Sequence, residues 1–216
     1  MRILQLAPIW ETVPPPAYGG TEVVIGCLAD ELVRRGHEVV LYASGDSHTS
    51  AELRSVVPCS LRQTGLTDDG YQYALVHVAH ALSEAGDFDI VHSHSGPPSE
   101  IGMALSPLSP APMLTTLHNM LLDDTRFIWG SYGGWYNAIS EEQLRQLPKL
   151  PRATCAGAVH NGIDVQSFPF RPEKQDYLLF IGRMTPEKGP HIAIEAAQRL
   201  GMRIVLAGKV ALPTER

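Results

Sequence analysis

Residues 176–208 have the sequence DYLLFIGRMTPEKGPHIAIEAAQRLGMRIVLAG, and this stretch decides the fold class. The short apolar run at 177–181 predicts a buried strand. Apolar residues at helical spacing follow and end at Gly201, and residues 203–207 predict a second strand. A strand, a helix and a strand in this order form one βαβ unit of a parallel sheet. Ligands of such sheets bind outside the carboxyl ends of the strands.

Two cations lie at this end of the unit. Arg183 directly follows the first strand, and we expect Lys188 in the first turn or two of the helix. Two positive charges near a helix N-terminus fit a diphosphate, whose charge is spread over several ångströms. Solvated surface charge is an equally consistent interpretation of the two residues by themselves.

The overall composition indicates a soluble globular protein that does not bind nucleic acid. The 216 residues are 44% hydrophobic and 19% charged, with a net charge of -6 and no long block of like charges. The three cysteines form no CxxC pair, which argues against a disulfide framework or a structural zinc site and fits the cytoplasm. No apolar run approaches the roughly 18–20 residues of a membrane-spanning helix, so we expect no integral membrane segment.

The first 43 residues predict another complete βαβ unit. Residues 2–7 and 38–43 are the expected strands, and the helix between them is expected to begin at Thr21 as its N-cap. We expect its core-facing positions to be Val24, Leu28 and Leu32, with Glu22 among the charged residues turned elsewhere.

Two glycines, Gly19 and Gly20, lie between the first strand and this helix. In a Rossmann-like domain this position brings backbone amides and a helix terminus to a phosphate. A simple tight turn explains the two glycines equally well, because no GxGxxG or Walker motif is present.

Strands and helices keep alternating up to residue 159. This alternation predicts a doubly wound, Rossmann-like α/β domain with a parallel sheet. The polar, proline-containing segment that follows indicates a domain boundary. We therefore expect a first domain at 1–165, a linker at 166–176, and part of a second Rossmann-like domain at 177–216.

Histidines follow two of the expected strands. His92 and His94 alternate on one strand and therefore share a face, while His94 and His118 each lie at a strand's carboxyl end. A metal site would need a third ligand that the sequence does not supply, so we expect no metal. We interpret His94 and His118 as polar contacts to a ligand in one cleft.

Six short motifs together resemble retaining glycosyltransferases of family 4. Their order and spacing match throughout the chain, and the last of them is the most specific. They are YGGTE (18–22), GHEV (36–39), FDIVHSHS (88–95), LHN (117–119), NGID (161–164) and FIGRMTPEKG (180–189). The resemblance implies a GT-B fold of two facing Rossmann-like domains, with the acceptor bound mainly by the first and the sugar nucleotide mainly by the second. It also implies no required metal or other cofactor.

The resemblance assigns a role to each matching residue. His118 would contact the transferred sugar as the catalytic residue, while the leaving phosphate itself would take the acceptor's proton. The donor diphosphate would be bound by Gly19, Gly20, Arg183 and Lys188. The residues expected to contact the acceptor or the sugar are Tyr18, His94 and Asn119.

The implied partners are a nucleotide-diphosphate sugar and a glycan, lipid or small-molecule acceptor. Family members continue into a segment with two glutamates that holds the donor ribose, whereas this chain ends at Arg216. We therefore expect an incomplete transferase that needs a second copy or a complementing chain. A non-catalytic binding module derived from a glycosyltransferase remains an alternative, as does a phosphate-ester enzyme that transfers no sugar.

Overall fold

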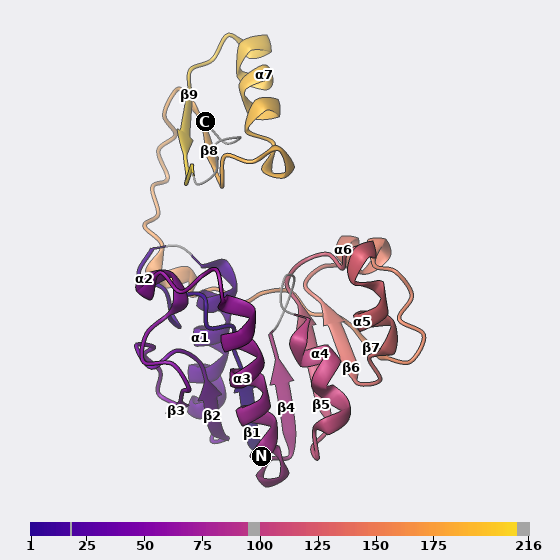
Figure 1. The fold of residues 1–216 in the computed structure, drawn as a ribbon. Helices are drawn as coiled ribbons and strands as arrows, with labels where there is room; N and C mark the ends of the chain where they lie inside the picture. Colours follow the sequence, from indigo (N-terminus) through magenta and orange to yellow (C-terminus); the bar gives the residue numbers. More distant parts are fainter. Residues whose placement is uncertain (18, 95–99, 211–216) are drawn as a thin grey trace. The chain divides into compact units, whose positions relative to one another are not determined.

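The computed structural model describes residues 1–17, 19–94 and 100–210, so the predicted contact residue Tyr18 lies outside the described residues. The chain divides into two compact units, Met1–Val165 and Gln166–Arg216 (Figure 1).

The first unit is built on a seven-stranded sheet in which every neighbouring pair of strands is parallel. The spatial order is β3-β2-β1-β4-β5-β6-β7, so β1 lies inside the sheet and the chain winds outward from it in both directions. This arrangement confirms the predicted doubly wound α/β fold. The strands are β1 (Arg2–Leu6), β2 (Glu38–Tyr42), β3 (Glu52–Arg54), β4 (Ile90–Ser93), β5 (Met113–Leu117), β6 (Trp135–Ala138) and β7 (Thr154–Ala158).

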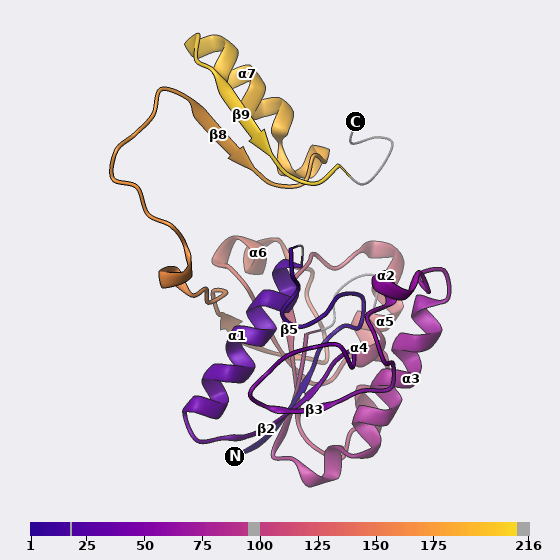
Figure 2. The same cartoon turned by 90° about the vertical axis from the view of Figure 1, so that its left-hand side faces the viewer.

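Helices lie on both faces of this sheet, with α1 on one face and α3 on the other (Figure 2). The largest hydrophobic cluster joins alternate strand residues such as Leu4, Val91 and Met113 to apolar residues of the α3 and α4 helices. A smaller cluster joins Ile25 of α1 to Leu41 of β2. The helices of this unit are α1 (Gly20–Arg34), α2 (Leu61–Thr64), α3 (Gly70–Ser83), α4 (Ile101–Leu105), α5 (Arg126–Ser131) and α6 (Glu141–Gln146). Short 3-10 turns lie at Ala85–Asp87, Ser106–Leu108, Asp123–Thr125 and Val165–Ser167.

Helix α1 differs from its prediction in two ways. It begins at Gly20 with Gly19 as the N-cap, so Thr21 lies inside the first turn and does not cap it. Its buried residues are Glu22, Ile25, Gly26 and Ala29, whereas Val24 and Leu28 are only half-buried. Close packing favours this face because small residues let the helix approach the chain at Val13 and Pro14, which face Gly26. The predicted apolar stripe of α1, which consists of Val24, Leu28 and Leu32, is therefore only half-buried and lies beside the core.

The second unit contains the predicted βαβ element. Strands β8 (Leu178–Ile181) and β9 (Ile204–Ala207) are parallel and hydrogen-bonded, and α7 (Pro190–Leu200) connects them. The helix starts later than predicted, because a separate 3-10 turn, η5 (Pro186–Lys188), precedes it. Lys188 thus lies in this turn and not in the first turns of the helix. Gly189 separates η5 from α7 with a φ of 73°, a backbone conformation that favours glycine.

Candidate active site

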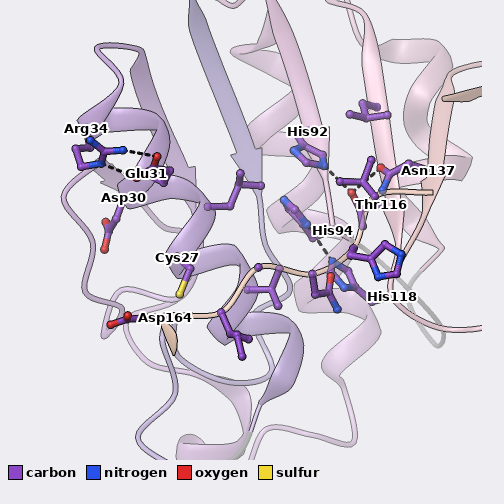
Figure 3. Close-up of a pocket in the computed structure, with 18 residues that line it drawn as sticks. Cys27, Asp30, Glu31, Arg34, His92, His94, Thr116, His118, Asn137 and Asp164 are labelled. Atoms are coloured by element: carbon purple, nitrogen blue, oxygen red, sulfur yellow. Dashed lines mark hydrogen bonds and ion pairs between the residues drawn. The ribbon is translucent and has the colours of Figure 1, made fainter. Parts of the chain in front are cut away.

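A pocket of about 730 Å³ lies within the first unit, at the carboxyl ends of its central strands (Figure 3). One wall comes from α1 and includes Val24, Cys27 and Leu28. The opposite wall is polar and comes from β4, β5, β6 and the residues that follow them, and residues 159–164 line the remaining side. The half-buried stripe of α1 therefore faces a pocket, which is why it does not join the core.

The polar wall is held together by a set of side chains that we call the polar row: Gln5, His92, His94, Thr116, His118 and Asn137. Neighbouring strands bring them together, since Gln5 of β1 is in register with His92 of β4, and Thr116 of β5 with Asn137 of β6. Most members are buried, and His94 is only 1% exposed.

Hydrogen bonds connect the whole polar row. His118 Nε2 lies 3.1 Å from His94 Nδ1, and His94 Nε2 lies 2.6 Å from Gln5 Oε1. Gln5 Nε2 lies 3.3 Å from His92 Nδ1, and His92 Nε2 lies 2.7 Å from Thr116 Oγ1. The hydroxyl of Thr116 then donates to Asn137 Oδ1 at 2.8 Å. Figure 3 shows His118 next to His94 and His92 next to Thr116 along this wall.

The three histidines of the polar row are neutral at pH 7. Burial lowers the pKa of His118 to about 4. Burial, with a smaller contribution from the neighbouring His118, lowers the pKa of His92 to about 4. Burial also moves the pKa of His94 well below its usual value. Imidazoles of this kind act as hydrogen-bonding groups without charge.

Both predicted strand-end histidines line the pocket, but with different exposure. His94 uses both ring nitrogens inside the polar row and is nearly inaccessible, while His118 is half-buried at the end of the row. A ligand in the pocket would therefore meet His118 first. Asn119 is exposed, and its carbonyl oxygen accepts a hydrogen bond from Gln143 Nε2 at 3.0 Å.

The two predicted phosphate-contacting glycines have different surroundings. A Cβ atom on Gly19 would lie 2.7 Å from Glu22 Oε2 and 2.8 Å from Pro15 Cγ, whereas one on Gly20 would meet nothing within 4 Å. Glu22 is buried at the first turn of α1, and its carboxylate accepts a hydrogen bond from its own backbone amide. An acidic side chain thus already lies at the helix terminus that we expected to receive a phosphate.

The predicted cations lie in the second unit. Arg183 is half-buried and forms an ion pair with Glu187, with 3.3 Å between Nη2 and Oε1, and Lys188 is exposed. A Cβ atom on Gly182 would lie 3.8 Å from Cβ of Lys188, so η5 folds back against the end of β8. Both cations therefore lie at the carboxyl end of a parallel strand, and Arg183 is already paired with Glu187.

Gln5, Thr116 and Asn137 were not predicted as site residues. Each is a buried polar residue within a mostly apolar strand. That signal was available in the sequence, because a polar residue inside a buried parallel strand needs a hydrogen-bonding partner. What the sequence does not specify is which strands are neighbours.

Two further properties concern the described residues only. Among them, no group of three or more histidine, cysteine, aspartate or glutamate side chains is arranged to hold a metal ion. Nor does this part of the chain contain a helix with the length and apolar character needed to cross a bilayer.

Several known proteins resemble this chain in sequence and structure. Glycogen synthase of Mycobacterium tuberculosis is 25% identical over 265 residues, which cover 97% of this chain and 62% of the synthase. AviGT4, a glycosyltransferase involved in avilamycin A biosynthesis, superposes with a TM-score of 0.65 at 26% identity, covering 99% of this chain and 58% of AviGT4. The fold is also similar to that of Anabaena HepE, solved in complex with UDP and glucose, with a TM-score of 0.56 at 18% identity over 98% of this chain and 70% of HepE.

These matches place the chain within a family. The chain spans about three fifths of the length of the glycogen synthase that it matches. The family model described as Glycosyltransferase Family 4 matches residues 18–167, which include α1, the polar row from His92 onward and the carboxyl ends of the central strands. The chain belongs to glycosyltransferase family 4.

Proposed function

We propose that this protein takes part in transferring a sugar from a nucleotide-diphosphate sugar to an acceptor hydroxyl, with retention of the anomeric configuration. The observation that carries the proposal is the pocket at the carboxyl ends of β4 and β5, with the neutral His118 on its wall. A sugar offers several hydroxyl groups and no charge. The wall opposite α1 carries neutral hydrogen-bonding side chains, and the α1 wall combines apolar residues with the charged Asp30, Glu31 and Arg34. Such a mixture of apolar surface and hydrogen-bonding groups suits a sugar.

In this proposal His118 contacts the transferred sugar, with Tyr18 and Asn119 contributing to the sugar or acceptor site. The predicted contact His94 is nearly inaccessible, so it acts on the ligand only through its hydrogen bond to His118. Gly19 and Gly20 contact the donor diphosphate through backbone at the start of α1. Gly19 is the N-cap of a 15-residue helix and Gly20 is its first residue, and this position supports that role.

Arg183 and Lys188 are proposed to neutralise the departing diphosphate. Negative charge grows on that group as the sugar acquires oxocarbenium character, and fixed cations stabilise such charge. Both residues follow the carboxyl end of β8, where ligands of parallel sheets bind. The leaving phosphate itself would accept the proton of the acceptor hydroxyl, so this mechanism requires no protein nucleophile.

The proposal includes the partners of the protein. UDP is the first nucleotide to test, because HepE was solved with it, and the acceptor is a glycan, a lipid or a small molecule. We propose no metal requirement, and a cytoplasmic location, with which the three free cysteines agree.

A second copy or a complementing chain is the proposed protein partner. The second unit exposes apolar side chains on its short sheet and helix, including Leu179, Ile181 and Ile192. A group of exposed apolar side chains on one small unit is typical of an interaction surface. Sedimentation over a wide concentration range should reveal self-association, and a monomer at every concentration would contradict a homo-oligomer.

The test is release of nucleoside diphosphate from UDP-, GDP- and ADP-sugars, measured with and without EDTA. We expect release with one of the three donors, unaffected by EDTA, and lost when Arg183 and Lys188 are both replaced by alanine. Binding of a nucleotide sugar without any release, across a broad panel of acceptors, would favour the non-catalytic binding module. Absence of both binding and release would remove the proposal.

A further inference from the structure

Every hydrogen bond of the polar row donates the same way along the row, from His118 toward Asn137. The assignment of donors and acceptors begins at Asn137. The side-chain Nδ2 of Asn137 donates to the carbonyl oxygen of Ala138 at 3.3 Å. Rotating the amide by 180° would place Oδ1 against that carbonyl, so Nδ2 is held on this side and Oδ1 faces Thr116. The oxygen of Asn137 can only accept.

The next bond is fixed by the single proton of a hydroxyl group. Thr116 donates its proton to Asn137 Oδ1 at 2.8 Å, so its oxygen must accept in the bond with His92. That bond joins Oγ1 to His92 Nε2 at 2.7 Å, and Nε2 is therefore the protonated nitrogen of His92.

Gln5 extends the same order of donors and acceptors from His92 to His94. Because His92 is neutral, its Nδ1 carries a lone pair and must accept from Gln5 Nε2 at 3.3 Å. This orients the amide of Gln5, whose Oε1 accepts from His94 Nε2 at 2.6 Å. His94 is neutral as well, so its Nδ1 also carries a lone pair.

The chain ends at the pocket. His94 Nδ1 accepts from His118 Nε2 at 3.1 Å, which makes Nε2 the protonated nitrogen of His118. The remaining nitrogen, Nδ1 of His118, then carries a lone pair and has no hydrogen-bonding partner among the described residues. A lone pair at this position accepts a hydrogen bond from a donor such as a hydroxyl group, and it repels a phosphate or carboxylate oxygen.

We propose that Asn137 and Thr116, acting through His92, Gln5 and His94, fix the tautomer of His118 so that its Nδ1 accepts a hydrogen bond from a ligand hydroxyl. The identification of that hydroxyl as one on the transferred sugar rests on the proposed function, whereas the direction of the chain does not. The five residues behind His118 are positioning residues, since His118 is the member that meets the ligand.

The tautomers are measured directly by long-range 1H–15N spectra of the 15N-histidine-labelled protein at pH 7.5. We expect His92, His94 and His118 all to carry the proton on Nε2. His118→Gln assigns the terminal ring, and His92→Gln assigns the first. A proton on Nδ1 of His118 in the unaltered protein would overturn the proposal.

The role of the Thr116 hydroxyl is tested with a matched pair of variants, Thr116→Val and Thr116→Ser. Valine has the shape of threonine without its hydroxyl, so His92 Nε2 loses its acceptor and the chain can reverse, which places the proton on His118 Nδ1. Serine keeps the hydroxyl and should preserve the original tautomers. We expect the Nδ1 signal of His118 to move toward the protonated form only in the valine variant. Identical His118 signals in the two variants would contradict the role of Thr116.

Ligand binding separates this inference from the proposed function. Loss of one hydrogen bond of ordinary strength should weaken UDP-glucose binding by about 2- to 10-fold in Thr116→Val relative to Thr116→Ser, with UDP binding unchanged. If the tautomers are as expected but UDP-glucose does not distinguish the variants, the sugar contact of the proposed function fails and the directed chain stands. If the tautomers differ from expectation, the inference fails whatever the ligand does.

Discussion

The carboxylate of Glu22 lies against Gly19, so that a Cβ atom on Gly19 would fall 2.7 Å from Glu22 Oε2. Gly19 also has a φ of 142°, which residues other than glycine rarely adopt. Gly20 has neither this backbone conformation nor a close contact at its Cβ position. The sequence presents the two glycines as a pair, but only one of them is required by the fold.

Replacing these glycines by alanine should therefore have different effects. Gly19→Ala should lower the free energy of unfolding by about 1–3 kcal/mol, because it combines backbone strain with a collision. Gly20→Ala, at the first position of α1, should leave it unchanged or raise it by up to about 1 kcal/mol. Urea midpoints of the two variants measure the difference. Equal midpoints would show that Gly19 relaxes freely.

Glu22 and Glu31 should respond oppositely to neutralisation. Burial raises the pKa of Glu22, so its contribution to stability is lost as the pH rises through its folded-state pKa. Hydrogen bonds from Arg34 and then Arg35 lower the pKa of Glu31 to about 2, so its contribution is present above its unfolded-state pKa. At pH 7 we expect Glu22→Gln to raise the urea midpoint and Glu31→Gln to lower it. Both differences should shrink at pH 4, and a shared sign at pH 7 would argue against these environments.

If a diphosphate binds at the start of α1, Glu22 opposes it. Glu22→Gln should then tighten UDP binding by about 2- to 5-fold, the effect of removing one nearby like charge in a partly solvated site. Titration calorimetry at low and high salt measures this, and the gain should fall at high salt. Unchanged affinity at low salt would place the phosphate elsewhere.

His118→Ala should weaken UDP-glucose binding by about 2- to 10-fold and leave UDP binding unaltered, because the contact is with the sugar and is worth about one hydrogen bond. His80→Ala is the matched control, since His80 is exposed on α3 and does not line the pocket. A parallel loss of UDP affinity in His118→Ala would indicate that His118 contacts the nucleotide or supports the fold.

The elements of the fold could be predicted from the sequence because each strand is a short apolar run bounded by turn residues. The run ending at Ala7 and the run ending at Leu117 both show this pattern. The alternation with helices then implies parallel strands, since crossovers of this length return each strand in the same direction.

The neighbours within the sheet could not be predicted in the same way. Gln5 lies beside His92, which is 87 residues away in sequence, because β1 pairs with both β2 and β4. No local pattern encodes that pairing, so the polar row was visible only as separate residues. The helix that begins after Gly189 shows the same limit, because two proline-led turns, at Pro186 and Pro190, compete locally for the helix start.

Stability should fall steeply as the pH drops from about 6.5 to about 4. Burial lowers the pKa of His77, His92 and His118 to about 4, so in this window the unfolded chain binds protons that the folded protein does not. Each such histidine contributes up to about 1.4 kcal/mol of lost stability per pH unit. Urea midpoints between pH 7.5 and 4 should show this decrease in stability. His92→Gln should reduce the number of protons taken up on unfolding by about one. A flat profile above pH 5 would mean that these rings accept protons in the folded state.

The pair of Arg183 and Glu187 makes a final prediction about the second unit. The carboxylate of Glu187 lies 3.3 Å from the guanidinium of Arg183, so a diphosphate must compete with it for that cation. Glu187→Gln should therefore tighten UDP binding, by up to about 5-fold for an exposed ion pair, while Arg183→Ala and Lys188→Ala should each weaken it. Glu195→Gln is the matched control, because Glu195 forms a similar exposed pair with Arg199 within α7. Weaker UDP binding in Glu187→Gln would mean that the carboxylate orients Arg183 toward the phosphate and does not compete with it.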